Sequence, residues 1–423
     1  MAGRRRAVLR YEFRTQLVGV LVAVLLGSLL GGPFHASSTA SKSASGLGAA
    51  DPSPIEADLS DSPPACGHIV NCGAARMVYD AADGYAVAFL LCPGAGDLSS
   101  CTWKFSDGSW TNITSSTGPN PPPLSQETFV WDAADRCALL FGGLDLASAT
   151  WFTFLWSFQN GGWTNLTSSV PPEIPGAPYP VATYDSRDGY VVSVWTAFAN
   201  PALSPITWTY RGGTWENVTP PSWSGARFPY GPTAVDDPSD QGALFFGGLD
   251  ATDRAESNVS WLFSGGTWHV VDPRFEPPVR SGASMAYDSL AGYVLLVGGI
   301  EGPCTTGQAC VLASDEWTFA DGQWTNTTDS LRGNPPQEQN GQMVTDPADR
   351  YVLEGFGEGL PDSSGTYPAQ VDFYTYSNGT WTLLAAPSPA AGFPWVEFIL
   401  LAMGVAIGGL AIAVVVVRRR RKD

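Results

Sequence analysis

An eight-residue pattern recurs six times along this chain and constrains the fold more than any other feature. It consists of an aromatic residue, any residue, Phe or Tyr, two residues of any kind, Gly, any residue and Trp. The copies are WKFSDGSW from Trp103, WSFQNGGW from Trp156, WTYRGGTW from Trp208, WLFSGGTW from Trp261, WTFADGQW from Trp317 and YTYSNGTW from Tyr374. Their closing tryptophans lie 52 to 57 residues apart, and this near-even spacing indicates a structural repeat.

Each copy of the pattern predicts a β-hairpin. Trp317 and Phe319 lie two residues apart and therefore share one face of a strand. Gly322 can adopt the positive φ that closes a short turn. Trp324 begins the return strand and packs across from the first aromatic pair. A long period rich in short strands and Gly turns is typical of a propeller blade and not of a helical solenoid.

Two further strands precede each hairpin. The first ends in Tyr-Asp or a similar pair, as in MVYD at 77–80, and the second is an apolar run such as YVLLVGG from Tyr293. Four strands per repeat predict an all-β fold, a six-bladed propeller over residues 66–386. The loops between strands two and three and between repeats are long and varied, so we expect a binding surface on the face that carries them.

Paired aspartates mark the turn after the first strand, as in DAADG from Asp80 and DPADR from Asp346. Two carboxylates three residues apart can bind Ca²⁺. An Asp at a turn can instead accept hydrogen bonds from the backbone N–H groups of that turn. Because the pair recurs in most repeats, the sequence favours the structural role, and no metal site is predicted.

The fifth repeat, with its double Gly after an apolar strand (Gly298 and Gly299) and its two hairpin tryptophans, resembles a kelch repeat. This unit also builds the central domain of galactose oxidase. The double Gly recurs in the second and fourth repeats, whereas the other three have Leu90, Trp195 and Phe356 near that place. The resemblance covers residues 66–386 and implies a fold without implying an activity, since kelch propellers host both binding and catalysis.

Copper oxidases that resemble galactose oxidase need two His, two Tyr and a Cys joined to one Tyr. This chain has three His, at positions 35, 68 and 269, and no His pair lies on the propeller. The Ser-any-Asp-any-Gly pattern of a sialidase Asp-box is also missing, and we find no singular pair of acids for glycoside hydrolysis. The sequence therefore predicts no catalytic residue and no cofactor.

Six of the seven cysteines form close pairs and are candidates for disulfides: Cys66 with Cys72, Cys92 with Cys101, and Cys304 with Cys310. A metal site is the alternative, but the spacings are not CxxC and no His lies with them. Disulfides require an oxidising compartment. Cys137 lies in the apolar run CALLFGG and is expected to be a buried free thiol.

The start of the chain predicts export. Residues 1–40 combine early arginines with an uncharged apolar run, which is the layout of a secretory signal peptide, and an uncleaved anchor is the alternative. Residues 41–65 are rich in Ser, Ala, Gly and Pro and are expected to form a flexible stalk.

The end of the chain predicts membrane attachment. After a neck at 387–397, residues 398–417 carry no charge and are long enough to cross a bilayer as one helix. The basic tail at 418–423 follows as a positive-inside stop. The same layout also fits a sorting signal that is cut and replaced by a lipid or wall linkage.

Asn-x-Ser/Thr sequons begin at six positions and are candidates for glycosylation: Asn112, Asn165, Asn217, Asn258, Asn326 and Asn378. Four of them follow a closing Trp by two residues, where polar side chains alternating with Trp also fit the exposed face of an edge strand. With the propeller outside the cell, both interpretations can hold.

Most tryptophans occupy repeat positions and are expected to pack between blades, which leaves Trp195 and Trp223 as candidates for stacking on a ligand. A net charge of −18 disfavours nucleic acid, whose phosphates need Lys and Arg. The sequence thus predicts a single-pass cell-membrane protein whose extracellular propeller binds a protein or glycan, or serves as a structural part of the envelope, without catalysis. An extracellular carbohydrate-active enzyme on this scaffold is the alternative.

Overall fold

The computed structural model describes residues 75–384, apart from 94–97, 149, 152, 175–179, 196–205, 222–227, 251–254, 303–309, 361–367 and 369–371. The chain divides into two compact units, 1–53 and 54–423, and all described residues belong to the second. The segments expected as signal peptide, stalk, neck, transmembrane helix and basic tail lie outside the described residues. Within the described ranges, no helix has the length and apolar character needed to cross a membrane.

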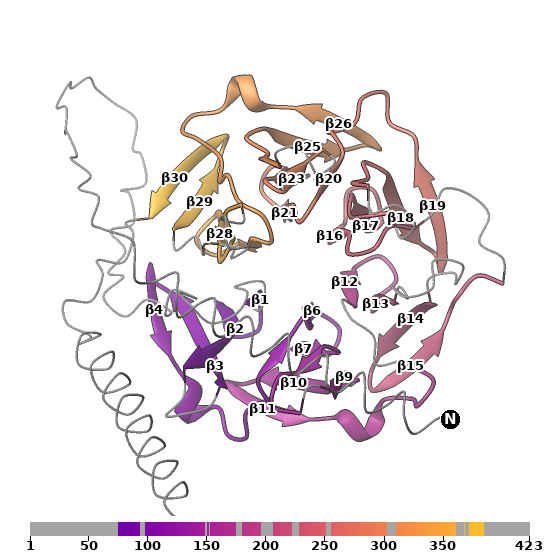
Figure 1. Ribbon diagram of the computed structural model, residues 1–423, viewed down its shortest axis with the longest axis vertical. Coiled ribbons are helices and arrows are strands. Elements are labelled where there is room, and N and C mark those ends of the chain that lie inside the picture. Colours follow the sequence, from indigo (N-terminus) through magenta and orange to yellow (C-terminus); the bar gives the residue numbers. More distant parts are fainter. Residues whose placement is uncertain are drawn as a thin grey trace, which may run out of the picture. The chain divides into compact units, whose positions relative to one another are not determined.

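The described residues form an all-β fold built on four-stranded antiparallel sheets, which we number in chain order (Figure 1). The first contains β1 (Arg76–Asp80), β2 (Tyr85–Pro93), β3 (Leu98–Ser106) and β4 (Ser109–Asn112), and the second β6 (Thr128–Asp132), β7 (Cys137–Phe141), β10 (Leu155–Gln159) and β11 (Gly162–Asn165). The third contains β12 (Val181–Asp185), β13 (Tyr190–Trp195), β14 (Ile206–Arg211) and β15 (Thr214–Asn217).

The fourth sheet contains β16 (Thr233–Asp237), β17 (Gly242–Phe246), β18 (Ser260–Ser264) and β19 (Thr267–Val271). The fifth contains β21 (Ser284–Asp288), β22 (Tyr293–Val297), β25 (Glu316–Ala320) and β26 (Gln323–Asn326), and the sixth β27 (Gln342–Asp346), β28 (Tyr351–Gly355), β29 (Phe373–Ser377) and β30 (Thr380–Leu384). The predicted hairpins are all present, since the third and fourth strands of every sheet pair across them.

The sheets stand around a common centre, with their first strands innermost (Figure 1). Each first strand contacts the first strand of the next sheet, and β27 contacts β1, so the sixth sheet closes the ring against the first. Both sheets at this junction are built from consecutive stretches of chain, and among the described residues no strand is shared across it.

The apolar core lies between neighbouring sheets, with one buried cluster at each junction. Side chains alternate along the second strands. Leu295 packs toward the sixth sheet, whereas Val294 and Leu296 pack toward the fourth. Each second strand therefore buries both of its faces, and this explains why these strands are continuous apolar runs.

The closing tryptophans connect neighbouring sheets through their indole N–H groups. Each of four indoles donates to the residue just before the hairpin of the preceding sheet: Trp163 to Thr102 Oγ1 (2.8 Å), Trp268 to Thr207 Oγ1 (3.0 Å), Trp324 to Ser260 Oγ (2.9 Å) and Trp381 to Glu316 Oε2 (2.7 Å). Within the part of the chain that the structure describes, the buried indole N–H groups of Trp110 and Trp215 have no hydrogen-bond partner. The repeated Trp thus packs between sheets, as predicted.

The aspartates of the first turn cap that turn, as the sequence favours. The Oδ1 atoms of Asp80, Asp132, Asp237, Asp288 and Asp346 each accept two backbone N–H bonds from the turn, and that of Asp185 accepts one. The second Asp has a further role. Asp135, Asp188 and Asp240 accept the N–H of a hairpin Gly in the next sheet, at 3.0, 2.8 and 3.1 Å.

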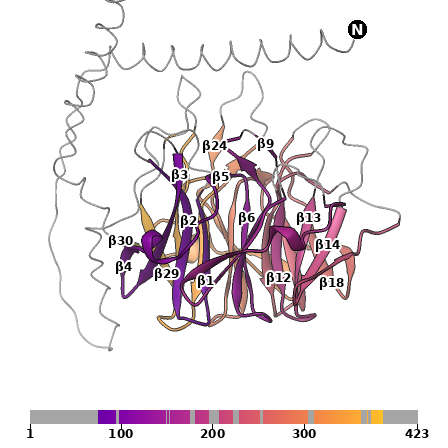
Figure 2. The same ribbon diagram turned by 90° about the horizontal axis from the view of Figure 1, so that it is seen from below.

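Two small three-stranded sheets extend the long loops. One contains β5 (Leu124–Ser125), β8 (Leu144–Asp145) and β9 (Thr150–Trp151), and the other β20 (Arg280–Ser281), β23 (Ile300–Glu301) and β24 (Val311–Leu312). Both combine the segment before a first strand with the loop between strands two and three of the same repeat. They lie at the end of the ring that carries the long loops (Figure 2).

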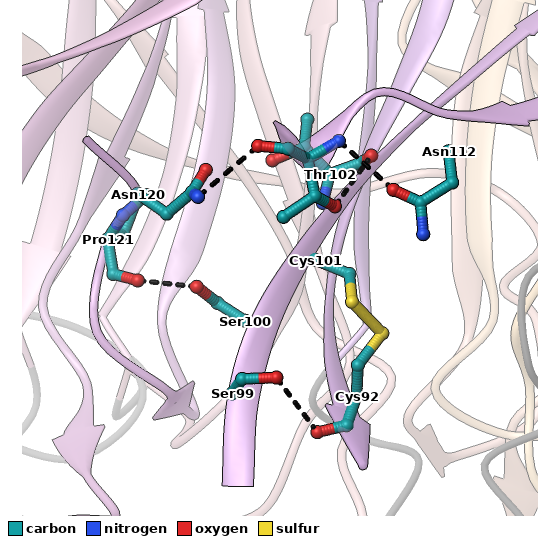
Figure 3. Close-up of a disulfide and its surroundings, with 9 residues drawn as sticks. Cys92, Ser99, Ser100, Cys101, Thr102, Asn112, Asn120 and Pro121 are labelled. Carbon is teal, nitrogen blue, oxygen red and sulfur yellow. Dashed lines mark hydrogen bonds between the residues drawn. A yellow bond between two sulfur atoms is a disulfide. The ribbon is translucent and has the colours of Figure 1, made fainter. Parts of the chain in front are cut away.

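Of the predicted disulfides, that between Cys92 and Cys101 is confirmed and joins β2 to β3 (Figure 3). Cys310 is also disulfide-bonded, and Cys304, its predicted partner, lies outside the described residues. The Cys66–Cys72 pair lies outside them as well. Cys137 is a buried free thiol, as predicted, and burial raises its pKa to about 12.

Candidate functional site

A central channel of about 600 Å³ runs between the first strands of all six sheets. Its lining combines apolar residues of the first strands, among them Val78 and Val130, with polar ones. At the mouth on the long-loop face the lining includes Arg76, Glu127 and Asn340. Charged and polar side chains therefore lie beside the long loops.

Two buried glutamates lie behind the channel wall at this mouth. Glu338 precedes β27 in the loop from the fifth sheet, and Glu354 lies near the end of β28; they are 3 % and 0 % exposed. Their carboxyl groups are within hydrogen-bond reach of each other. Burial, and then the neighbouring carboxyl of Glu338, hold the pKa of Glu354 well above its ordinary value.

Glycines make room for this pair. A Cβ at Gly341 would lie 2.3 Å from Glu354 Oε1, 2.6 Å from Glu338 Oε1 and 2.7 Å from Ser284 Oγ. A Cβ at Gly357 would lie 2.0 Å from Glu338 Oε1. Neither position can carry a larger side chain while the carboxyl groups stay where they are.

Glu354 breaks the repeat at a position that is otherwise apolar or small. The corresponding residue is Leu140 in β7, Phe245 in β17 and Leu296 in β22. Glu338 corresponds to Arg280, because each lies four residues before the first strand of its sheet. The backbone oxygen of each also accepts an N–H from the second Gly of the preceding sheet's double Gly: Gly299 for Glu338 and Gly248 for Arg280. The Glu338–Glu354 pair therefore occurs in one repeat and was not predicted from the sequence. The signal that could have revealed it is the charged residue Glu354 inside the otherwise apolar strand β28.

In the fifth sheet, the buried charge of Arg280 at the position of Glu338 is compensated by ion pairs. It is fully buried and makes a two-pronged ion pair with Asp315, at 2.8 and 2.9 Å, with Glu301 at 3.3 Å. Its guanidinium lowers the pKa of Asp315 against the effect of burial. Glu338 instead accepts a backbone hydrogen bond from Gly357, which lowers its pKa against the effect of burial, and no cationic side chain among the described residues lowers the pKa of Glu354.

Glu127 is a third buried acid at the mouth, just before β6. Both of its carboxyl oxygens lack a hydrogen-bond partner among the described residues. Burial raises its pKa, and the charge of Arg76 opposes this. Arg76 Nε donates to the backbone oxygen of Glu127 at 2.7 Å, so the two side chains line one side of the mouth.

Asp236 lines the other end of the channel, at the end of β16. It stands where the first, third and fifth sheets have a Tyr: Tyr79, Tyr184 and Tyr287. Its Oδ1 accepts the N–H of Ser186 at 3.0 Å. Burial raises its pKa to about 7, and the nearby charges of Asp185 and Asp237 add to the shift.

The sequon asparagines have a structural role that the sequence analysis missed. The side-chain oxygens of Asn112, Asn165, Asn217 and Asn326 each accept the N–H of the residue two positions on, at 2.9 to 3.0 Å. These four side chains are exposed at the ends of outer strands. Asn378 is exposed in a hairpin turn, and Asn258 donates to Glu276 at 2.8 Å.

The two tryptophans proposed to stack on a ligand, Trp195 and Trp223, do not form a binding site among the described residues. Trp195 is 2 % exposed, packs against Phe141 between the second and third sheets, and donates to Ser193 Oγ at 3.2 Å. As it lies, its ring has no free face to offer a ligand. Trp223 lies outside the described residues. Among the described side chains, no group of three or more His, Cys, Asp or Glu is arranged to bind a metal ion.

Comparison with known proteins finds similarity among solved structures. No protein-family model matches the chain, and no curated protein matches it. The chain is similar to a solved structure titled "Structure of YjhT", with a TM-score of 0.49 and 14 % sequence identity over 73 % of this chain and 97 % of that one. At this level the similarity says nothing about function, and the fold rests on the strand pairing described above.

Proposed function

We propose that this chain is a six-bladed, kelch-type propeller displayed outside the cell on the helix at 398–417, where it binds a partner without catalysis. The observation that supports this is the contrast between the two ends of the ring. One end consists of short capped turns. The other carries the small sheets β5–β8–β9 and β20–β23–β24 (Figure 2). The channel mouth at this end is lined by polar residues such as Arg76 and Asn340.

At the short-turn end, the repeated Asp and Gly residues have structural roles and are not available to bind a partner. Its aspartates cap turns or bind neighbouring hairpins, and its glycines close them. Irregular loops on a rigid scaffold are where binding residues tend to lie. The long-loop end also exposes apolar side chains, since Val311 on β24 is 56 % exposed. This end is therefore the proposed recognition surface.

The direction of the strands supports a position of that surface near the membrane. β1 begins and β30 ends on the long-loop side, because first strands run away from it and fourth strands return to it. The described chain therefore begins and ends on the recognition side. We propose a protein or glycan in the same envelope as the partner, rather than a distant soluble one.

The alternative function, a carbohydrate-active enzyme, would need two carboxyl groups that flank a substrate. In glycosidases these groups are about 5–9.5 Å apart. Glu338 and Glu354 form the singular acid pair of the described residues, but they contact each other and are buried. Their arrangement favours binding over hydrolysis.

A binding and turnover assay on the full chain in detergent tests the proposal. A glycan array, a panel of envelope proteins and a hydrolysis assay on the same glycans are run in parallel. We expect binding without turnover. Val311→Asp should weaken it, whereas Leu290→Asp should not, because Leu290 is similarly exposed (47 %) in a turn at the opposite end of the same repeat. Turnover, or equal effects of the two variants, would refute the proposal.

Location and glycosylation are tested in cells. We expect protease added outside intact cells to digest the propeller and a tag after Asp423 to remain protected. We also expect glycans on the exposed Asn112, Asn165, Asn217 and Asn326, and mass spectrometry of the purified protein should detect them. A protected propeller would refute the proposed orientation.

A further inference from the structure

The buried glutamate pair has more unsatisfied oxygens than a proton can satisfy. Glu354 Oε1 and Oε2 and Glu338 Oε1 are buried without a hydrogen-bond donor among the described residues. One proton shared between the two carboxyl groups would satisfy at most two of these atoms. Burying the remainder without a partner costs about 1–3 kcal/mol for each group, and more when the group is charged.

A third side chain from a different sheet points at the same place. Ser284, at the start of β21, is 4 % exposed, and no hydrogen bond of its hydroxyl to a described residue is found. Its Oγ and the Oε1 atoms of Glu354 and Glu338 are the three atoms nearest to where a Cβ on Gly341 would lie, so these three oxygens are close to one another. Glu354 is on β28, Glu338 is in the loop before β27 and Ser284 is on β21 of the neighbouring sheet.

We propose that Glu338, Glu354 and Ser284 bind one Ca²⁺ ion between the fifth and sixth sheets. Ca²⁺ binds carboxylate and hydroxyl oxygens in flexible geometry, which suits a site with two carboxylates and one hydroxyl. A divalent cation compensates both buried charges and supplies a partner for buried carboxyl oxygens that have none among the described residues. Mg²⁺ fits less well, because it requires a near-ideal octahedron and retains its water.

The channel provides the way in and the remaining ligands. Gly341 and Ser284 both line it, so the site opens toward solvent beside the mouth. Water molecules in the channel complete the coordination shell. The strongly acidic chain, with a net charge of −18, attracts cations to this opening. Bound Ca²⁺ would join the loop before β27 to β28 and β21 and so stabilise the last sheet of the ring.

The test compares melting of the full chain in detergent at pH 7.5, first stripped with EDTA and then supplied with millimolar CaCl₂ or MgCl₂. We expect Ca²⁺ to raise Tm by several degrees and Mg²⁺ to raise it much less. Calorimetric titration should give one ion per chain at this site. The same Tm in Ca²⁺ and in EDTA, or equal effects of Ca²⁺ and Mg²⁺, would overturn the proposal.

Variants locate the ion. Glu354→Gln should abolish the Ca²⁺-dependent rise in Tm, and the matched control Glu127→Gln, a second buried acid at the mouth, should retain it. Ser284→Ala removes a ligand without changing the charge and should weaken Ca²⁺ binding at least about tenfold. It keeps the test decisive if Glu354→Gln fails to fold. A response to Ca²⁺ that persists unchanged in Ser284→Ala would place the ion elsewhere and refute this site.

Discussion

The fifth and sixth sheets share one strand order and one hairpin geometry, yet they differ at the positions that matter most for packing. The fifth has Leu296 in its second strand, followed by Gly298 and Gly299. The sixth has Glu354 and Phe356 at the places of Leu296 and Gly298. The fold therefore tolerates departures from the repeat, provided that neighbouring groups compensate for them.

At the junction between the sixth and first sheets, ring packing compensates for the unfavourable backbone conformation of Phe356. Its φ is +66°, a value that usually requires Gly. Its ring packs against Trp110 and Phe373, with centroids 5.4 and 5.0 Å away. The indole N–H of Trp110 finds no acceptor among the described residues, unlike that of Trp324 in the fifth sheet. Aromatic packing thus replaces the hydrogen bond of the regular junctions.

The largest expected effect comes from removing a closing Trp at a regular junction. Trp324→Ala should lower the free energy of unfolding by about 3–5 kcal/mol, because it empties a buried site against Phe246 and Phe319. Denaturant unfolding followed by circular dichroism measures this loss.

A pair of milder variants sharpens the comparison. Trp324→Phe loses the bond to Ser260, whereas Trp110→Phe loses none, so the first should cost about 1 kcal/mol more than the second. Equal costs would show that the indole hydrogen bond contributes nothing to the regular junctions.

The second prediction concerns Gly298 and Phe356, which occupy the first position of the double Gly in the fifth and sixth sheets. Gly298→Ala should destabilise by about 2–3 kcal/mol, since φ is +66° and the new Cβ would meet the backbone oxygen of Glu338 at 2.5 Å. Phe356→Gly should also destabilise, by a similar amount, because relieved strain offsets only part of the lost ring packing. If Phe356→Gly were stabilising, the aromatic compensation proposed at the closing junction would be wrong.

The regular parts of the molecule were predictable because their determinants are local. Aromatic residues two apart, a turn Gly and a returning Trp specify a hairpin, and Asp80 caps its own turn through atoms two and three residues away. The Cys92–Cys101 pair lies on adjacent strands of one hairpin, so a short sequence separation sufficed to predict it.

The irregular parts depend on contacts that no local pattern encodes. Glu338 and Glu354 are sixteen residues apart, and Ser284 comes from the neighbouring sheet. Their convergence follows from how the sixth sheet meets the fifth. Trp195 illustrates the converse. It departs from the repeat and was a candidate for ligand binding, but it fills the space between two sheets. A departure in the sequence does not reveal whether the residue faces a site or a junction.

The third prediction concerns the pH dependence of stability and Asp236, which replaces the Tyr found at this position in the first, third and fifth sheets. A carboxyl group whose pKa is raised on folding, here from 3.8 to about 7, contributes stability that is fully present below the lower value and is lost as the pH rises to the higher one. We expect the denaturation midpoint, measured in EDTA, to fall between about pH 4 and pH 7 and to level off above that range. Asp236→Asn should reduce this fall, with the variant more stable than the parent at pH 8. An unchanged pH dependence would mean that Asp236 stays ionised in the folded protein.

The smallest expected effect concerns the turn caps, which all the sheets share. Asp288 accepts two N–H bonds, at 3.0 and 3.2 Å, so Asp288→Ala should cost about 1 kcal/mol, the usual loss when a side chain that caps backbone N–H groups is removed. Asp240→Ala removes only one bond, to Gly322 of the next sheet, and should cost less than Asp288→Ala. Unfolding midpoints of the two variants decide the order. If Asp240→Ala cost more, contacts between sheets would contribute more than the caps within them, and the repeat would owe its second Asp to ring assembly.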